Sequence, residues 1–584
     1  MDPEPPIPSL RWRILLLGLL SVGMGVFAWY TMLGNYPRTQ FGDGQMFHKG
    51  IEAARVSVVR YHELPLWNPY ECGGNPLWDN PEQMAAAPLL WPVLFLGTTV
   101  EVYFWCIIHG ALGFLAMWLF GRHELRLTRV ATFLAASIWA FCGFHQQHAS
   151  TGHLSFASFE YFPLAILLWR RAETDLRAAA GLGALVAWML YEAGTYSVPH
   201  LALFLAAETL TRAWPAKRFV PIGRAAAVVV AVTVIVGAAR LFPLVAQLGA
   251  HTRALEPETD HLTWQTLRDM FLVRQHGWGA AGQTYVWPEY WAYLGPIVVV
   301  LGLVGIALAG IEYAWLVALL VLAFVLMCGH FAPWAPWSIL KGHIFPFKEM
   351  RVPARFRCEV SLFLAAFCGI AIDRLRQLAQ RKVPSHATTI GAFIVALGFV
   401  GVGDLLSTSL IWIETRWPQA PESHPMPSTR LYYGGPGLAP FIDQPQQNRG
   451  RLDCWGEWGS FYSGAPLWEG DVPQARGATK DVVVEVGNRT QNTFSIDAVL
   501  TRPGRVLVNS SYDRAWRTDV GTLVEVNRQL VLELPEGRHH VHLRYWPIGL
   551  TAGLLLSTFG TAAVVAYFVW DARRKRHQRL PYPA

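Results

Sequence analysis

The residues best suited to chemistry lie at positions 41–92, a polar stretch that follows the first long apolar segment. Asp43 stands there between two glycines, so its carboxylate would be accessible. Partly apolar surroundings at a membrane edge would raise its pKa toward that of a general base, whereas a solvated turn aspartate is the alternative. Further acidic, imidazole and aromatic side chains follow at Glu52, His62, Glu63, Glu71, Asp79 and Glu82, and at Trp67, Tyr70, Trp78 and Trp91. This mixture suggests a site for a polyhydroxylated or lipid-linked substrate.

Within this stretch, ELPLWNPYECGGNPLWDNPEQ holds three Asn-Pro turn signals. So many fixed turns predict a defined loop. Trp67 and Trp78 would stack against sugar rings or belong to an aromatic belt at headgroup level. Cys72 and Cys454 are the two cysteines that fall clearly in long polar regions, and they could form a disulfide in an oxidising compartment.

A second group is basic. Lys348, Arg351 and Arg355, followed by Arg357, precede a membrane segment on its predicted outer side, where basic residues are normally depleted. Guanidinium groups at headgroup level suit a lipid phosphate, and simple anchoring by snorkelling is the alternative. Arg240 lies within an apolar run, which makes it a functional candidate. It would meet a lipid phosphate or pair with Glu160 or Glu192.

Three histidines, His145, His148 and His153, follow one another in HQQHASTGH. Their spacing matches no strong zinc template, so hydrogen bonding within a loop or to substrate is favoured over a metal. The acidic loop Glu256, Glu258, Asp260 and His261 is interpreted mainly as a solvated rim.

The elements that must position these residues are membrane helices. The chain has 584 residues, of which 53% are hydrophobic and 15% charged, against about 25% charged in soluble proteins. Apolar runs predict about twelve transmembrane helices, the first of them uncleaved. They lie at roughly 12–34, 100–120, 128–144, 156–169, 178–192, 198–212, 222–248, 291–310, 313–329, 358–373, 389–411 and 547–570.

Charge predicts the orientation. Basic residues gather in alternate loops and in the C-terminal tail, and only the turn near Glu312 lacks them. Both termini would therefore be cytoplasmic, with 35–99, 249–290, 330–357 and 412–546 outside. The net charge of +7 is explained by this pattern, and nucleic acid is not expected as a partner.

The long segment 412–546 differs from the rest. From about residue 480 short runs of Val, Leu, Thr and Tyr alternate with polar residues, which predicts a small antiparallel β-sandwich. We therefore expect a transmembrane domain at 1–411 whose first outer loop, 35–99, is catalytic. An extracytoplasmic domain would follow at 412–546, and a last helix with a basic tail at 547–584.

Several segments carry a resemblance that runs along nearly the whole chain. They are Asp43, the loop LPLWNPYECGGNPLWDNPEQ, FPFKEMRVPARFR, RPGRVLVNSSYDRAWRTDV and LPEGRHHVHLRYWP. In this order they resemble the YfhO-type bacterial membrane proteins, a branch of the GT-C glycosyltransferases.

The resemblance implies a GT-C-like fold in the bacterial cytoplasmic membrane, a polyprenyl-phosphate-linked sugar as donor and an envelope glycan or lipid as acceptor. Asp43 would deprotonate the acceptor hydroxyl, and Arg351, Arg355, Arg240 or Lys348 would hold the donor phosphate. Acceptor or sugar binding would fall to Glu52, His62, Trp67, Asn68, Glu71, Trp78 and His153. No cofactor or resident metal is expected, in line with the absence of Walker, GxGxxG and HExxH motifs.

Two other functions compete with a transferase. A transporter or flippase for lipid-linked glycans should show internal repeats and matching broken helices, which the sequence does not clearly contain. A non-catalytic scaffold would tolerate Asn at position 43, whereas an enzyme needs the carboxylate.

Overall fold

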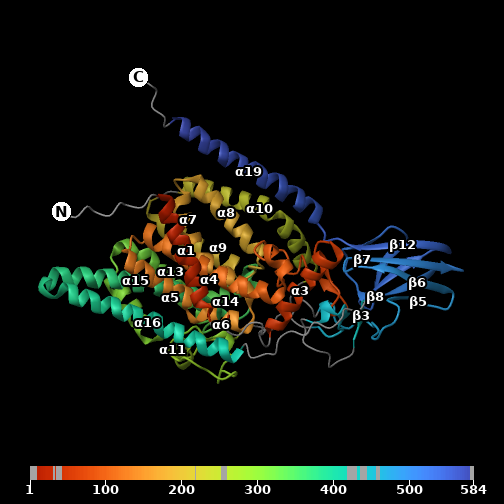
Figure 1. Cartoon of the computed structure of the whole chain (residues 1–584), viewed down its shortest axis with the longest axis horizontal. Helices are drawn as coiled ribbons and strands as arrows, with labels where there is room; N and C mark the ends of the chain where they lie inside the picture. Colours follow the sequence, from red (N-terminus) through yellow and green to blue (C-terminus); the bar gives the residue numbers. More distant parts are fainter. Residues whose placement is uncertain are drawn as a thin grey trace.

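The computed structural model describes residues 10–30, 33, 43–216, 219–251, 259–416, 431–434, 443–454 and 461–578. A body of packed helices occupies most of the molecule, and a strand-rich region lies at one end of it (Figure 1). The last helix, α19 (Leu550–Gln578), runs from the strands back along the body and packs against α10 (Phe219–Ala250).

Five helices in the described part of the chain are long and apolar enough to cross a membrane, or six if one bent pair counts as a span. They are α1 (Leu10–Ala28), α4 (Thr98–His123), α10, α16 (Ala387–Arg416) and α19. The bent pair is α12 (Gly295–Leu308) and α13 (Ala314–Met327), whose axes differ by 118°. This is the pattern of a multi-pass membrane protein.

The expected twelve spans are not confirmed, although each of the twelve apolar segments contains a helix. α5 (Arg129–Phe141), α7 (Phe162–Ala172), α8 (Leu176–Tyr191), α12 and α13 have 11 to 16 residues. A straight span needs about 20. α9 (Ser197–Ala216) and α15 (Arg357–Lys382) are long enough, but charged residues interrupt them.

The first outer loop is a compact piece of structure. Asp43 is the first residue of α3 (Asp43–Tyr61), rather than the tip of an open turn. After α3 every residue at positions 65–81 is buried, including the short strands β1 (Trp67–Asn68) and β2 (Asn75–Pro76). Gly74 has φ +112°, and a Cβ there would lie 2.6 Å from the Trp67 ring. The prediction of a defined loop matches this close packing.

The strand-rich region contains two four-stranded sheets, β10-β11-β8-β5 and β6-β7-β12-β9. Neighbouring strands in both sheets are antiparallel and share one buried apolar core. Their bounds are β5 (Ala475–Gly477), β6 (Val482–Arg489), β7 (Thr493–Leu500), β8 (Gly504–Ser511), β9 (Trp516–Thr518), β10 (Thr522–Val526), β11 (Gln529–Leu534) and β12 (Gly537–Tyr545). The strand-rich region predicted from residue 480 is therefore present.

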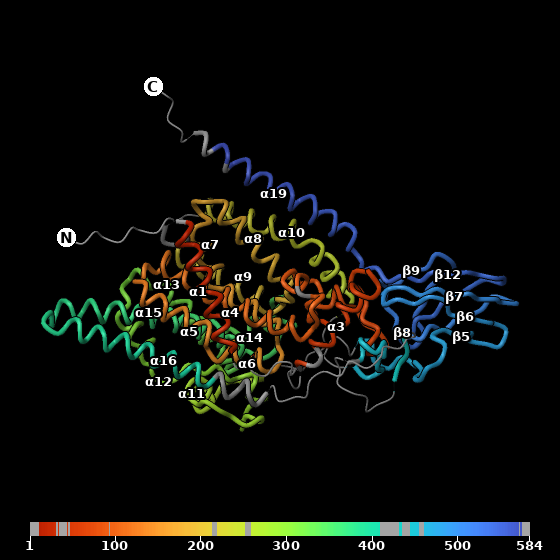
Figure 2. Tube along the Cα trace, in the orientation of Figure 1, coloured from red at the N-terminus to blue at the C-terminus, as the bar shows by residue number. Residues whose placement is uncertain are grey.

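The first outer loop lies between the helical body and the strands (Figure 2). Trp67 is fully buried, with ring centroids of Tyr545, Trp516 and Tyr462 4.6, 5.3 and 6.1 Å away. Cys72 forms a disulfide with Cys454, and Ser511 donates its hydroxyl hydrogen to the Cys72 carbonyl over 2.7 Å. These contacts join the loop to the strand region.

On its other side the loop is held by α10. Arg240 donates to the carbonyl oxygens of Asn80 and Gln83 at 2.7 and 3.0 Å. Trp78 donates its indole N–H to the carbonyl of Ala239 at 2.9 Å. The buried Trp78 and Arg240 therefore fasten the loop to the body.

A buried carboxyl at this junction makes stability depend on pH. The hydroxyl of Tyr545 lies 3.4 Å from both oxygens of Asp79. Burial, and secondarily the Asp513 carboxylate, raises the pKa of Asp79 to about 8 although Arg240 opposes the shift. The carboxyl ionises at about pH 4 in the unfolded protein and at about pH 8 in the folded protein. Between these two values the folded protein binds one more proton than the unfolded protein. The free energy of unfolding therefore falls as pH rises through this window, and levels off above it.

We expect the free energy of unfolding of Asp79→Asn to decline less steeply with pH, because the amide keeps the shape of the aspartate side chain and does not titrate. Unfolding midpoints of the detergent-solubilised protein between pH 5 and pH 9 measure this. Asp481→Asn, at an exposed ion pair with Arg502, is the control and should leave the profile unchanged. An equally steep profile for Asp79→Asn would show that this carboxyl does not carry the effect.

Candidate functional site

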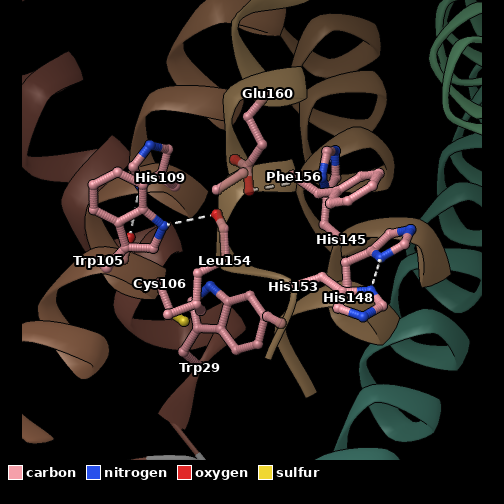
Figure 3. Close-up of a pocket in the computed structure, with 12 residues that line it drawn as sticks. Trp29, Trp105, Cys106, His109, His145, His148, His153, Leu154, Phe156 and Glu160 are labelled. Atoms are coloured by element: carbon pink, nitrogen blue, oxygen red, sulfur yellow. Dashed lines mark hydrogen bonds and ion pairs between the residues drawn. The ribbon is translucent and has the colours of Figure 1, made fainter. Parts of the chain in front are cut away.

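A small pocket lies inside the helical body at the end of α1 (Figure 3). Its volume is about 20 Å³, room for roughly one water molecule. Its walls come from α1, α4, α6 (Gly143–Thr151) and the 3₁₀ helix η2 (Leu154–Tyr161). The lining residues are Trp29, Trp105, Cys106, His109, His145, His148, Ala149, His153, Leu154, Phe156, Ala157 and Glu160.

The turn at each end of α6 sets the histidines in place. Gly143 packs directly on the backbone of Tyr293, where a Cβ would come within 2.2 Å of the amide nitrogen. α6 ends at Gly152, which has φ +90°, and the His153 amide then donates to the His148 carbonyl at 2.8 Å. This left-handed cap folds His153 back over α6. The Nδ1 atoms of His148 and His153 are 3.0 Å apart.

The hydrogen bonds of His148 define its tautomer. Arg357 Nη2 lies 2.9 Å from His148 Nε2, and because a guanidinium can only donate, Nε2 is the acceptor. Burial and the nearby Arg357 charge lower the pKa of His148 well below its ordinary value. The neutral ring therefore carries its proton on Nδ1 and donates it to His153 Nδ1. His153 is left with its own proton on Nε2.

Two guanidinium groups and one carboxylate form the wall behind these histidines. Arg355 makes a bidentate ion pair with Glu289 of η3 (Trp287–Glu289), at 3.0 and 2.5 Å. Burial alone would raise the pKa of Glu289, but Arg355 lowers it to about 2. The Arg355 guanidinium also lies 4.9 Å from the ring of Phe156, which lines the pocket, and 4.4 Å from that of Tyr196.

Arg357 donates to neutral acceptors. It contacts His148 and the backbone carbonyls of Pro288, Glu289, Trp291 and Ala354, at 2.6 to 3.3 Å. Arg355 and Arg357 together bring two positive charges against the single charge of Glu289. The group of these three side chains, called the arginine wall below, thus has a net charge of +1.

A second network lies deeper in the body. Glu192 accepts from the Tyr161 hydroxyl at 3.1 Å and from the Trp188 indole at 2.6 Å. His109 Nε2 is 3.3 Å from Glu192 and 3.0 Å from the Tyr161 oxygen. Glu160 lies 3.8 Å from His145 Nδ1. These pairings correct the expectation that Arg240 would pair with Glu160 or Glu192, since its donors reach the first outer loop instead.

The predicted phosphate-binding residues are thus divided. Arg355 adjoins the pocket, and Arg351 lies close by, its backbone N–H donating to the Tyr196 hydroxyl at 3.4 Å. Arg240 lies on the far side of the loop, and Lys348 is exposed. Position 43 is the start of α3, which contacts α6, but the Asp43 side chain lies outside the described residues.

The predicted acceptor residues are also dispersed. His153 alone among them lines the pocket. Glu52 is buried against Arg55 and Thr98, and Glu71 pairs with buried Lys49 at 3.4 Å. Trp67, Asn68 and Trp78 are buried within the loop packing, where their rings and amide have no open face, and His62 is exposed just after α3.

No metal site is found in the described part of the chain: no three His, Cys, Asp or Glu side chains there are arranged to hold an ion. The three histidines do not converge because His145 faces Glu160 while His148 pairs with His153. In the acidic loop, Glu256 and Glu258 fall outside the described residues. Asp260 is buried and accepts from the Tyr290 hydroxyl at 2.7 Å, so it is not a solvated rim residue.

Sequence reasoning missed Glu289, Trp29 and His109. Glu289 is flanked by aromatics in WPEYW, but no local pattern connects it with Arg355, 66 residues away. Trp29 and His109 lie in apolar runs where side chains usually serve packing. The only available signal was the rarity of His inside such a run.

Comparisons with known proteins do not assign the chain to a family. No protein-family model matches the chain, and no curated protein does. Arabinofuranosyltransferase AftD from Mycobacteria is similar with TM-score 0.44 and 15% identity, over 71% of this chain and 27% of that chain. Arabinosyltransferase EmbB from Mycobacterium smegmatis has TM-score 0.36 and 12% identity, over 93% and 64%. The chain spans less than two thirds of either protein, and likeness of this degree assigns it no family.

The arginine wall yields a stability prediction. Glu289→Ala leaves a buried guanidinium uncompensated, so we expect a loss of about 3–5 kcal/mol in the free energy of unfolding. The double variant Glu289→Met, Arg355→Met should recover much of this loss, because it removes both charges. Unfolding midpoints in detergent measure both effects.

The matched control is Glu533→Ala, which breaks an exposed pair with Arg505 and should cost about 0–1 kcal/mol. A Glu289→Ala loss no larger than that of the control would contradict the assignment of the wall as a buried, coupled group.

Proposed function

We propose that this protein is an integral-membrane glycosyltransferase. It would move a sugar from a polyprenyl-phosphate donor to a cell-envelope acceptor on the outer face of the bacterial cytoplasmic membrane. The observation that carries the proposal is the arginine wall with its net charge of +1, next to a polar pocket in a membrane-embedded body. The charge of such a wall attracts a lipid phosphate, and the planar guanidinium fork of the neighbouring Arg351 matches phosphate oxygens.

The reaction then needs a base and a stabilised leaving group. Asp43 takes the proton of the acceptor hydroxyl while that oxygen attacks the anomeric carbon. The bond between the anomeric carbon and the phosphate oxygen breaks, and its electron pair leaves with the polyprenyl phosphate. Attack opposite to the departing phosphate inverts the anomeric centre. Because the lipid phosphate is itself the leaving group, no nucleotide takes part.

The four arginines of this region would have different roles in stabilising the leaving phosphate. Arg355 has its charge balanced by Glu289, so it holds the wall together. Arg357 donates its hydrogen bonds to neutral groups, so these bonds leave its charge unbalanced. Arg351, half-buried beside Tyr196, is the residue we assign to direct phosphate contact. Arg240 is assigned to holding the loop, because it donates hydrogen bonds to two loop carbonyls.

The role of Asp43 is tested in cells. Surface glycans are compared by mass spectrometry in a deletion strain complemented with wild type, Asp43→Asn or the surface control Asp481→Asn, at equal membrane levels. We expect one sugar to disappear on deletion, to return with wild type and Asp481→Asn, and to stay absent with Asp43→Asn, because an amide cannot accept the proton.

Full recovery with Asp43→Asn would remove Asp43 as the base. Glycans unchanged by deletion would contradict the transferase itself, and would favour a transporter or a scaffold for lipid-linked glycans.

A further inference from the structure

Three hydrogen-bonding atoms of the pocket have no hydrogen-bond partner among the residues that the structure describes. They are Trp29 Nε1, His145 Nε2 and Glu160 Oε2. The three residues are only 2%, 4% and 2% exposed. Figure 3 shows Glu160 above the pocket, Trp29 below it and His145 at its side. Three separate parts of the chain, the residue that follows α1, α6 and η2, thus each bring an unsatisfied polar atom to one small cavity.

Such a cluster is costly to leave empty. Leaving a buried polar group without a partner destabilises the fold, and native proteins satisfy the large majority of such groups. The Glu160 carboxylate also lies against Gly113 of α4, where a Cβ would come within 2.1 Å of Oε2. The carboxylate therefore fits only because residue 113 is a glycine. A larger side chain at position 113 would occupy the same space.

The chemical types of the three atoms complement a hydroxyl group. An indole N–H only donates, a carboxyl oxygen that carries no proton only accepts, and an imidazole nitrogen does either according to its tautomer. A carboxyl group keeps one such accepting oxygen even when it is protonated. Burial lowers the pKa of His145 to about 3, so the ring is neutral. A hydroxyl group donates one hydrogen bond and accepts up to two. A volume near 20 Å³ admits one such oxygen and excludes a sugar ring.

We propose that this pocket, called the hydroxyl pocket below, binds a single hydroxyl group of the donor sugar and so sets which sugar is transferred. This inference rests on the proposed function. Trp29 Nε1 donates to the hydroxyl oxygen, and the hydroxyl hydrogen is donated to Glu160 Oε2. His145 Nε2 completes the contacts. The sugar ring lies over the half-buried side of the pocket at Ala149, His153 and Ala157.

The arrangement also orients the donor. Phe156 lines the pocket with one part of its ring and underlies the Arg355 guanidinium with its face. A sugar with one hydroxyl in the pocket can therefore direct its phosphate toward the arginine wall. The His148–His153 pair lines the pocket on the side where His148 accepts a hydrogen bond from Arg357 of the arginine wall. A donor lacking the bound hydroxyl leaves three buried groups unpaired, and discrimination follows from that penalty.

The test measures donor specificity with full-length protein in lipid nanodiscs. The donors are short-chain polyprenyl-phosphate forms of the sugar found by the surface-glycan comparison, together with each of its monodeoxy analogues. We expect wild type to discriminate against one analogue by about 100-fold or more in kcat/KM, and against the others much less.

Trp29→Phe keeps the ring and removes the donor. We expect the discrimination against that one analogue to fall to about tenfold or less, because the removed hydrogen bond no longer separates the two donors. Trp12→Phe, at an exposed position of the preceding helix α1, is the matched control and should keep the wild-type ratio. A purely structural defect in Trp29→Phe would lower kcat/KM for all donors by the same factor and leave their ratio unchanged.

Equal use of all monodeoxy donors by wild type, or an unchanged ratio in Trp29→Phe, would overturn the hydroxyl pocket while leaving the transferase in place. The same holds if a high-resolution map with bound donor shows a water molecule in the pocket and the sugar elsewhere. If deletion changes no glycan and no polyprenyl-phosphate sugar is turned over, the proposed function fails, and the hydroxyl pocket falls with it.

Discussion

The insertion of Trp67 into the core of the strand-rich region is the interaction on which the rest of the structure depends. Burying a tryptophan removes about 150–250 Å² from water, which stabilises the contact by roughly 4–6 kcal/mol. Its partners Trp516 and Tyr545 are about 450–480 residues further along the chain. The Cys72–Cys454 disulfide lies in the same loop. The first outer loop is therefore a fixed joint between the strands and the helical body.

This joint has consequences for the site. With the loop held by the strands on one side and by α10 on the other, α3 is kept against α6. The histidines of α6 in turn contact Arg357 at the start of α15. The packing of α3 on α6 and the hydrogen bond from Arg357 to His148 thus connect the helix that Asp43 begins, the hydroxyl pocket and the arginine wall. We infer that the strand-rich region acts as a clamp on the loop, at a distance from the chemistry.

Much of the fold could be predicted from the sequence, because it depends on local patterns. All twelve apolar segments contain helices, and the alternation after residue 480 became strands. Span number could not be predicted in the same way, because short helices such as α5 and α7 meet other helices within the body. The Glu289–Arg355 pair and the loop contacts of Arg240 could not be predicted from the sequence either, because they are tertiary contacts between segments far apart in the chain. Trp67 and Trp78 were predicted to stack against sugar rings, but both side chains are buried in the packing of the loop.

The central claim is that a lipid phosphate binds beside the arginine wall on the outer side of the body. A cryo-EM map of the full-length protein in nanodiscs with added polyprenyl phosphate tests it most directly. The account predicts phosphate density within hydrogen-bonding distance of Arg351, with the lipid chain leaving toward the bilayer and the start of α3 facing the phosphate. Phosphate density at another place in the body, or none at saturating lipid, would contradict it.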